Sequence, residues 1–151
     1  MRNFISEDDI EQAILQKLEG DPFQYGILRC DPSPDKRELL PDGTGRSSKK
    51  ECVLPLILRE ALARLNPDIP GEKLEEIARD LCRDFSATDM TATNYKYYNQ
   101  IRNGIKISLR RNGKEDFDFV KLVDFDRPEN NTFTAVSQLW IPVSYPHLTL
   151  P

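Results

Sequence analysis

Apolar residues recur at helical spacing in four segments of the chain, a pattern typical of helices that bury one face. Ser6 can cap the first helix, acidic residues fill its first turn, and Gly20 stands where a helix would end. Pro55 suits the first turn of the second helix, and Asn66 with Pro67 would end it. The sequence therefore predicts helices over residues 7–18, 55–65, 72–84 and 91–102.

The period of the apolar residues changes to two after residue 104, and this change predicts strands. Residues 105–109 alternate apolar and polar side chains, and apolar residues return over 117–123. Asn112 and Gly113 between them form a strong hairpin turn. Two further strands are expected over residues 25–30 and 132–141. The predicted fold class is α/β with an α+β-like order, in which N-terminal helices precede a mixed or antiparallel sheet.

A polar stretch over residues 31–50, rich in Pro, Gly, Asp and Ser, is expected to be a mobile loop. It contains the sequence GTGRSSKK, which looks superficially like a phosphate-binding loop. A glycine directly before the lysine and a preceding apolar strand are both missing. We therefore expect no nucleotide to bind there.

The net charge of the chain is -4 and its pI is about 5.1. Domains that bind nucleic acid on their own usually carry a basic excess, so we expect the chain alone to bind DNA poorly. Two basic clusters are interpreted as solvated faces, with contact to the DNA backbone as the alternative. They comprise Arg46, Lys49 and Lys50, and then Arg102, Lys106, Arg110 and Arg111.

Cysteine and histidine usage limits the possible chemistry. Cys30, Cys52 and Cys82 have no spacing of a disulfide framework or a zinc site, so each is expected to be a buried or half-buried apolar residue in a reducing cytoplasm. His147 is the single histidine, which excludes histidine-based catalysis for the rest of the chain.

No apolar run approaches the roughly 18 residues of a membrane span, so no membrane partner is expected. Carboxylates that hold Mg²⁺ stay possible.

Three groups of residues are candidates for function. Glu11 lies inside the apolar stripe of the first helix, where a carboxylate needs a partner. A face of the fourth helix combines Tyr95, Tyr98 and Ile101, which we assign to the core, with stacking on bases as the alternative. An acidic pair in the sequence DFDRPENN suggests a metal site, but a loop whose polar side chains satisfy turn amides is the better interpretation. That loop would use Asp124, Asp126, Asn130 and Asn131.

Four ordered blocks of the chain resemble the N-terminal nuclease domain of the endonuclease subunit of type I restriction enzymes. The blocks are ISEDDIEQAILQKLEG, LILREALARLNPDIPGEKLEEIARDL, TNYKYYNQIRNGIKI and LVDFDRPENNTFTAVSQLWI. The resemblance implies a restriction-endonuclease-like fold over residues 1–142. It also implies that the intact parent cleaves unmodified double-stranded DNA with Mg²⁺ and ATP, in a complex with methylation and specificity subunits.

In that family, a strand with Pro-Asp and then a strand with Glu-x-Lys follow the segment that matches FTAVSQLWIP, and neither follows it here. We therefore expect an incomplete domain that binds no cofactor and is inactive alone. The resemblance also implies an accessory active-site role for Glu11 in the intact protein, with a structural carboxylate as the alternative. Residues 143–151, VSYPHLTLP, look like translated sequencing adapter, which would make His147 non-native.

Two further expectations follow from an incomplete sheet. The strand over residues 132–141 would have an unpaired edge and an uncovered apolar face, which favours aggregation. The alternative function is a non-enzymatic docking module, in which the helices over residues 55–102 bind a protein partner and the sheet only supports them.

Overall fold

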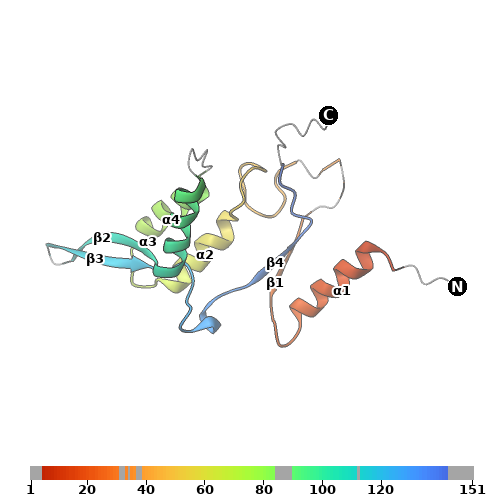
Figure 1. Ribbon diagram of the computed structural model, residues 1–151, viewed down its shortest axis with the longest axis horizontal. Coiled ribbons are helices and arrows are strands. Elements are labelled where there is room, and N and C mark those ends of the chain that lie inside the picture. Colours follow the sequence, from red (N-terminus) through yellow and green to blue (C-terminus); the bar gives the residue numbers. More distant parts are fainter. Residues whose placement is uncertain are drawn as a thin grey trace.

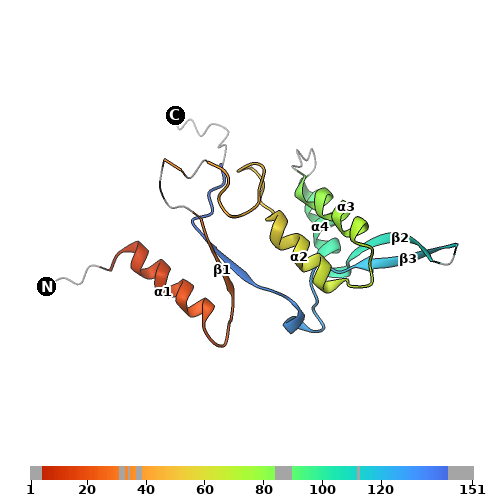
Figure 2. The same cartoon turned by 180° about the vertical axis from the view of Figure 1, so that it is seen from behind.

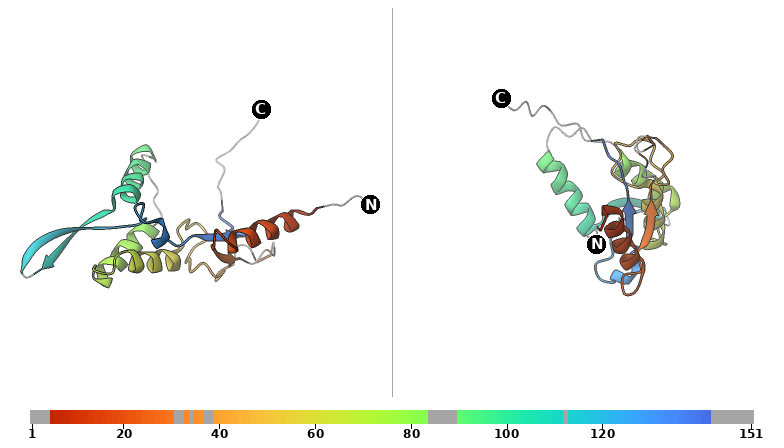
Figure 3. Two further views of the ribbon diagram at one scale, coloured as in Figure 1. Left: turned by 90° about the horizontal axis from the view of Figure 1, so that it is seen from below. Right: turned by 90° about the vertical axis from the view of Figure 1, so that its right-hand side faces the viewer.

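A computed structural model describes residues 5–30, 33, 35–36, 39–83, 90–111 and 113–142. Its elements form two lobes side by side (Figure 1). Helix α1 (Glu7–Glu19) and strands β1 (Gly26–Arg29) and β4 (Thr134–Ser137) make one lobe. The other lobe contains helices α2 (Pro55–Leu65), α3 (Gly71–Cys82) and α4 (Met90–Asn103), and strands β2 (Ile105–Arg111) and β3 (Lys114–Val120). The hairpin β2–β3 projects at one end of the molecule and α1 lies at the other (Figure 3).

Helix α1 begins at the capping residue that the sequence predicts. Ser6 Oγ accepts a hydrogen bond from the main-chain N–H of Asp9 at 3.1 Å, and the Asp9 carboxylate accepts one from the N–H of Ser6 at 3.0 Å. A cap of this kind stabilises a helix by about 1 kcal/mol. The helix then runs to Glu19 and ends at Gly20. The predicted first helix is thus confirmed.

The strands form two separate two-stranded sheets rather than the single sheet predicted from the sequence. Strand β4 does not pair with the hairpin. It pairs in parallel with β1 (Figure 2). In this pairing, Gly26 lies opposite Thr134. The strand predicted over 132–141 is also shorter than expected, because Gln138 has a φ of 57° and leaves the extended conformation. Local alternation predicted the strand, but the choice of partner depends on distant residues.

The hairpin β2–β3 follows the predicted pattern. Its register places Arg111 opposite Lys114, which leaves a two-residue turn. Gly113 has a φ of 78°, as such turns require, while Asn112 lies outside the described residues. The predicted turn position is therefore confirmed.

The main hydrophobic core lies where the α2–α3 pair contacts one face of the hairpin. Its buried residues are Leu62, Ile69, Leu74, Ile77, Ala78, Leu109 and Val120. The helical stripes of α2 and α3 and the inward residues of the two strands meet there, as their spacing predicts. Asn66, also buried, joins the end of α2 to the segment after β3, because its Oδ1 accepts a hydrogen bond of 2.7 Å from the main-chain N–H of Lys121. Residue 84, the predicted end of α3, lies outside the described part of the chain.

The apolar stripe of α4 that the sequence assigned to the core is exposed, so that assignment was wrong. Tyr95, Tyr98 and Ile101 are between 45% and 69% exposed. Instead, Tyr97 and Gln100 line a small cavity together with Ile77 of α3. The described core cluster of α2, α3 and the hairpin contains no residue of α4.

Residues 42–51 form a loop without helix or strand, as predicted, but they fold around a buried arginine, so the predicted solvated basic face was wrong here. Arg46 and Lys49 are buried, and both pair with the Asp42 carboxylate at 2.7 Å. Lys50 is exposed. A buried cation needs a charge partner and several acceptors, and sequence spacing alone does not show that they will meet.

The three cysteines are free thiols in different surroundings. Cys30 is buried and Cys82 is half-buried, as predicted, whereas Cys52 is exposed, which the prediction missed. Burial raises the pKa of the Cys30 and Cys82 thiols. Among the described helices, none is both long and apolar enough to cross a bilayer.

Candidate functional site at the end of strand β4

Glu11 of α1 lies against the last residue of β4. Its Oε1 accepts a hydrogen bond of 2.6 Å from Ser137 Oγ, and its Oε2 accepts one of 2.7 Å from Gln138 Nε2. Helix α1 is brought to this position by the short turn that leads into β1, the parallel partner of β4. The sequence indicated that the Glu11 carboxylate needs a partner, and in the structure two neutral side chains take this place.

The main chain at this point is held in an uncommon conformation. Ser137 is buried and its carbonyl oxygen accepts a hydrogen bond of 3.1 Å from the N–H of Cys30. Gln138 follows with a φ of 57°, in the left-handed region that residues other than glycine seldom adopt. Such conformations persist only where the surroundings fix them, and they concentrate at functional sites.

The Glu11 carboxylate keeps its negative charge at neutral pH. The hydrogen bonds from Ser137 and then from Gln138 lower its pKa below the usual range, and they outweigh the raising effect of desolvation. Both donors are neutral, so they do not neutralise the charge. An ionised carboxylate at a strand end can attract a cation or orient a water molecule.

The rest of the α1 stripe is only partly covered. Leu15 is buried and Leu18 is half-buried, while Ile10 and Ile14 are each more than half exposed. The stripe that the sequence predicts is therefore divided between a packed side, which includes Glu11, and an open apolar side.

A second network fixes the chain just beyond Gln138. The Arg46 guanidinium donates hydrogen bonds of 3.3 Å to the carbonyl oxygen of Trp140. It also donates to Thr44 Oγ1 at 3.0 Å and to the carbonyl oxygen of Glu51 at 3.1 Å. Residues 137–140 are thus held from one side by Glu11 and from another by Arg46. Sequence reasoning missed Arg46, because a basic residue in a polar stretch gives no signal of burial.

A magnesium ion does not fit the residues that the structure describes. Mg²⁺ takes several oxygen ligands in a nearly octahedral arrangement. Glu11 supplies one carboxylate, and both of its oxygens already accept hydrogen bonds. Within the described ranges, no group of three or more His, Cys, Asp or Glu side chains is placed to hold a metal ion.

The acidic pair of the DFDRPENN segment forms a polar turn, as predicted. Asp124 Oδ1 accepts from the N–H groups of Asp126 and Arg127, and Asp124 Oδ2 accepts from Asn130 Nδ2 at 2.9 Å. Asn131 Oδ1 accepts from the N–H of Asp124 at 2.9 Å. The hydrogen bond from Asn130 is the largest of the effects that lower the pKa of Asp124. The Asp124 carboxylate is therefore bound into the loop, whereas Asp126 takes part through its main-chain N–H and its side chain is exposed.

The family model for the N terminus of the type I restriction enzyme R protein matches residues 4–147 of the chain. The chain belongs to this family. The matched range extends beyond Pro142. The domain boundary that the sequence analysis placed at Pro142 stays a prediction. His147 and residues 143–151 lie outside the described residues.

Two relatives agree with this membership of the R protein N-terminal family. The type I restriction enzyme HindI endonuclease subunit of Haemophilus influenzae is 30% identical over 137 residues, or 91% of this chain. A protein of Methanocaldococcus jannaschii, named as a type I restriction enzyme MjaIXP endonuclease subunit, is 25% identical over 139 residues, or 90% of this chain. The chain spans only 12% of the length of each relative. No solved structure matches.

Proposed function

We propose that this chain is part of the nuclease domain of a type I restriction endonuclease subunit. The intact parent would cleave unmodified double-stranded DNA with Mg²⁺ and ATP, assembled with methylation and specificity subunits in the cytoplasm. Family membership supports the class of enzyme, since both relatives carry the names of endonuclease subunits. A restriction-endonuclease-like fold for the complete domain belongs to the same proposal.

The observation that carries the proposal is the position of Glu11. An ionised carboxylate from the first helix stands at the end of β4, where the main chain has an uncommon conformation. Two hydrogen bonds orient it, so it is pre-organised before any ligand binds. We assign Glu11 an accessory role beside the cleavage site of the parent, where it would orient a water molecule or add negative charge next to a cation held by other residues.

The chain alone should not cleave DNA. Hydrolysis of a phosphodiester needs groups that stabilise charge on the phosphate and activate water. The described residues do not fit Mg²⁺, and the sequence contains no Glu-x-Lys. In the GTGRSSKK segment, Lys49 is buried and pairs with Asp42, so its ammonium group is already occupied.

Cleavage assays on the parent and on the chain test this proposal together. The complete subunit, co-expressed with its methylation and specificity subunits, should cut unmodified plasmid with Mg²⁺ and ATP and leave methylated plasmid intact. The isolated chain should cut neither plasmid. A complete complex that hydrolyses ATP but never cuts unmodified plasmid would contradict the proposal, as would cleavage by the isolated chain that Glu11→Gln abolishes.

A further inference from the structure

Exposed aromatic rings and basic side chains gather on α4, on the outer face of the hairpin and on the loop after β3. We call this surface the aromatic face and define it by Tyr98, Arg102, Lys106, Phe117, Phe119 and Phe125. Each of its four rings is more than half exposed. Large apolar groups exposed together mark a binding surface more often than isolated ones do.

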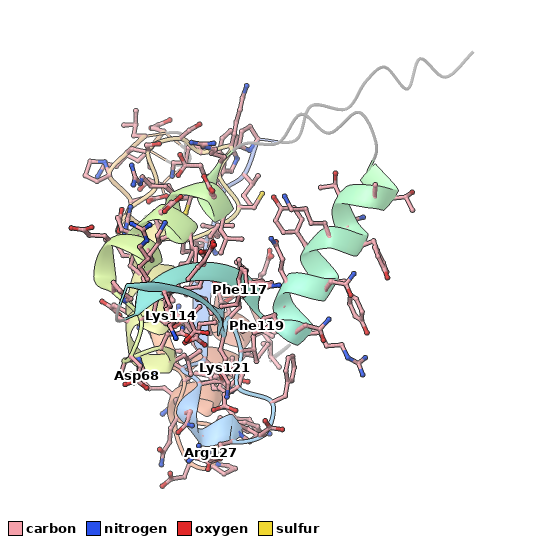
Figure 4. The ribbon with its side chains drawn as sticks, turned by 90° about the vertical axis from the view of Figure 1, so that its left-hand side faces the viewer. Asp68, Lys114, Phe117, Phe119, Lys121 and Arg127 are labelled. Carbon is pink, nitrogen blue, oxygen red and sulfur yellow. The ribbon has the colours of Figure 1, made fainter. Side chains whose placement is uncertain are left out.

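The parts of the aromatic face are continuous. The hairpin register places Lys106 opposite Phe119 and Ser108 opposite Phe117, on the side of the sheet away from the core. Helix α4 turns into β2 at Gly104, which lies directly against the main chain of Val120 and the Cβ of Phe119. Figure 4 places Phe117 and Phe119 on the side of the hairpin toward α4.

A hollow of about 470 Å³ extends the face at the C-terminal half of α4. Tyr98, Ile101 and Arg102 line it from the helix, and Phe125 lines it from the loop after β3. Its size suits a flat aromatic group placed between Tyr98 and Phe125.

Two of the rings are each held by a cation. Lys106 Nζ lies 4.2 Å from the centroid of the Phe117 ring. Arg102 Nη1 donates a hydrogen bond of 2.8 Å to the Tyr98 hydroxyl oxygen. These contacts orient the rings yet leave much of their surface exposed, and they keep a positive charge beside each ring.

The charge of the face favours an anionic ligand. Arg102, Lys106 and Arg110 lie on α4 and on the outer face of β2, while Glu115 is the acidic residue on the outer face of β3. The Glu115 carboxylate is partly satisfied, because its Oε1 accepts a hydrogen bond of 2.8 Å from Ser108 Oγ. Asp116 and Asp118 alternate to the other side of the sheet.

We propose that the aromatic face binds single-stranded nucleic acid. Bases would stack on Tyr98 and Phe117, and phosphates would lie near Arg102 and Lys106. Rings beside cations suit this ligand, because any base offers a flat face and any phosphate a negative charge. A duplex hides the faces of its bases, so exposed rings add little to duplex binding. The net charge of -4 limits the affinity, and we expect a dissociation constant of roughly 1–100 μM at low salt.

Fluorescence anisotropy of a labelled oligo-deoxythymidine strand tests the proposal on the full chain without Mg²⁺ or ATP. Phe117→Ala and Tyr98→Ala should each weaken binding at least about fivefold, while Phe117→Tyr should retain it. Lys106→Gln should weaken binding and reduce its salt dependence. Phe23→Ala, which removes an exposed ring between α1 and β1, is the matched control and should have no effect. Circular dichroism checks that each variant is folded.

Two results would overturn this inference. In the first, the single-stranded oligonucleotide and its duplex bind equally well and neither alanine variant changes the affinity. Contact with phosphates alone would then explain the binding. Failure to bind the strand, together with self-association that Phe117→Ala abolishes, would assign the face to a second copy of the chain. Because the assay needs no cleavage, its failure would leave the proposed nuclease role of the parent untouched.

Discussion

Arg46 donates two hydrogen bonds to the carbonyl oxygen of Trp140, a residue 94 positions later in the sequence. The side chain of Arg46 is fully buried and its guanidinium pairs with Asp42. It therefore fastens residues 42–51 to the segment that follows β4. Because Glu11 holds the preceding residues of that segment, the strand end that carries the candidate site depends on both contacts.

Replacing Arg46 should destabilise the chain strongly. Arg46→Met keeps the apolar stem but removes the hydrogen bonds to Trp140 and leaves Asp42 with Lys49 as its only described cation. Breaking a buried pair in this way costs about 3 kcal/mol, which urea denaturation can measure. Lys50→Met, at an exposed neighbouring position, is the matched control and should change stability little. Equal effects of the two variants would show that the Arg46 network does not hold the fold.

Stability should fall in acid because of Asp42. Burial alone would raise the pKa of Asp42, but hydrogen bonds from Lys49, Thr44 and Arg46 lower it well below its usual range. A carboxyl group with a lowered pKa in the folded state stabilises that state above its unfolded pKa of about 3.9, and this stabilisation is lost as pH falls further. The free energy of unfolding should therefore decrease below about pH 4.

The variant Asp42→Asn identifies the source of this pH dependence. It should flatten the decrease below about pH 4, whereas Glu19→Gln at the exposed end of α1 should leave the decrease as it is. Urea denaturation at several pH values measures both. An Asp42→Asn profile parallel to that of the unchanged chain would assign the acid sensitivity to other carboxylates.

Features set by neighbouring residues were predicted well from the sequence. The Ser6 cap and the helical spacing of α2 and α3 depend on residues a few positions apart, and so does the turn between β2 and β3. The polar turn around Asp124 was also confirmed, because the hydrogen bonds of the Asp124 and Asn131 side chains that form it join residues between 124 and 131.

Features set by distant residues were not predicted. The pairing of β4 with β1, the outward direction of Tyr98 and the burial of Arg46 each depend on which segments meet in the fold. Glu11 lies between these cases. Its place in an apolar stripe indicated that it needs a partner, but periodicity could not identify Ser137 or Gln138.

Two glycines with similar φ should respond differently to alanine. Gly104 has a φ of 80° and a Cβ there would lie 2.9 Å from the carbonyl oxygen of Val120, while Gly113 has a φ of 78° and open space around it. Gly113→Ala should cost about 1–2 kcal/mol from the left-handed conformation alone. Gly104→Ala adds a clash with main-chain atoms and should cost clearly more. Thermal denaturation of both variants measures the difference, and equal losses would show that α4 and β3 can separate freely at Gly104.

The role of Glu11 is best tested in the complete subunit, assembled with its partner subunits. Glu11→Gln keeps the shape of the side chain but removes the charge, and Glu19→Gln on the same helix is the matched control. The decisive measurement is the rate of plasmid cleavage relative to the rate of ATP hydrolysis. We expect Glu11→Gln to lower cleavage about tenfold or more while ATP hydrolysis stays unchanged. Cleavage at the same rate in the Glu11→Gln and Glu19→Gln enzymes would contradict a place for Glu11 beside the nuclease site.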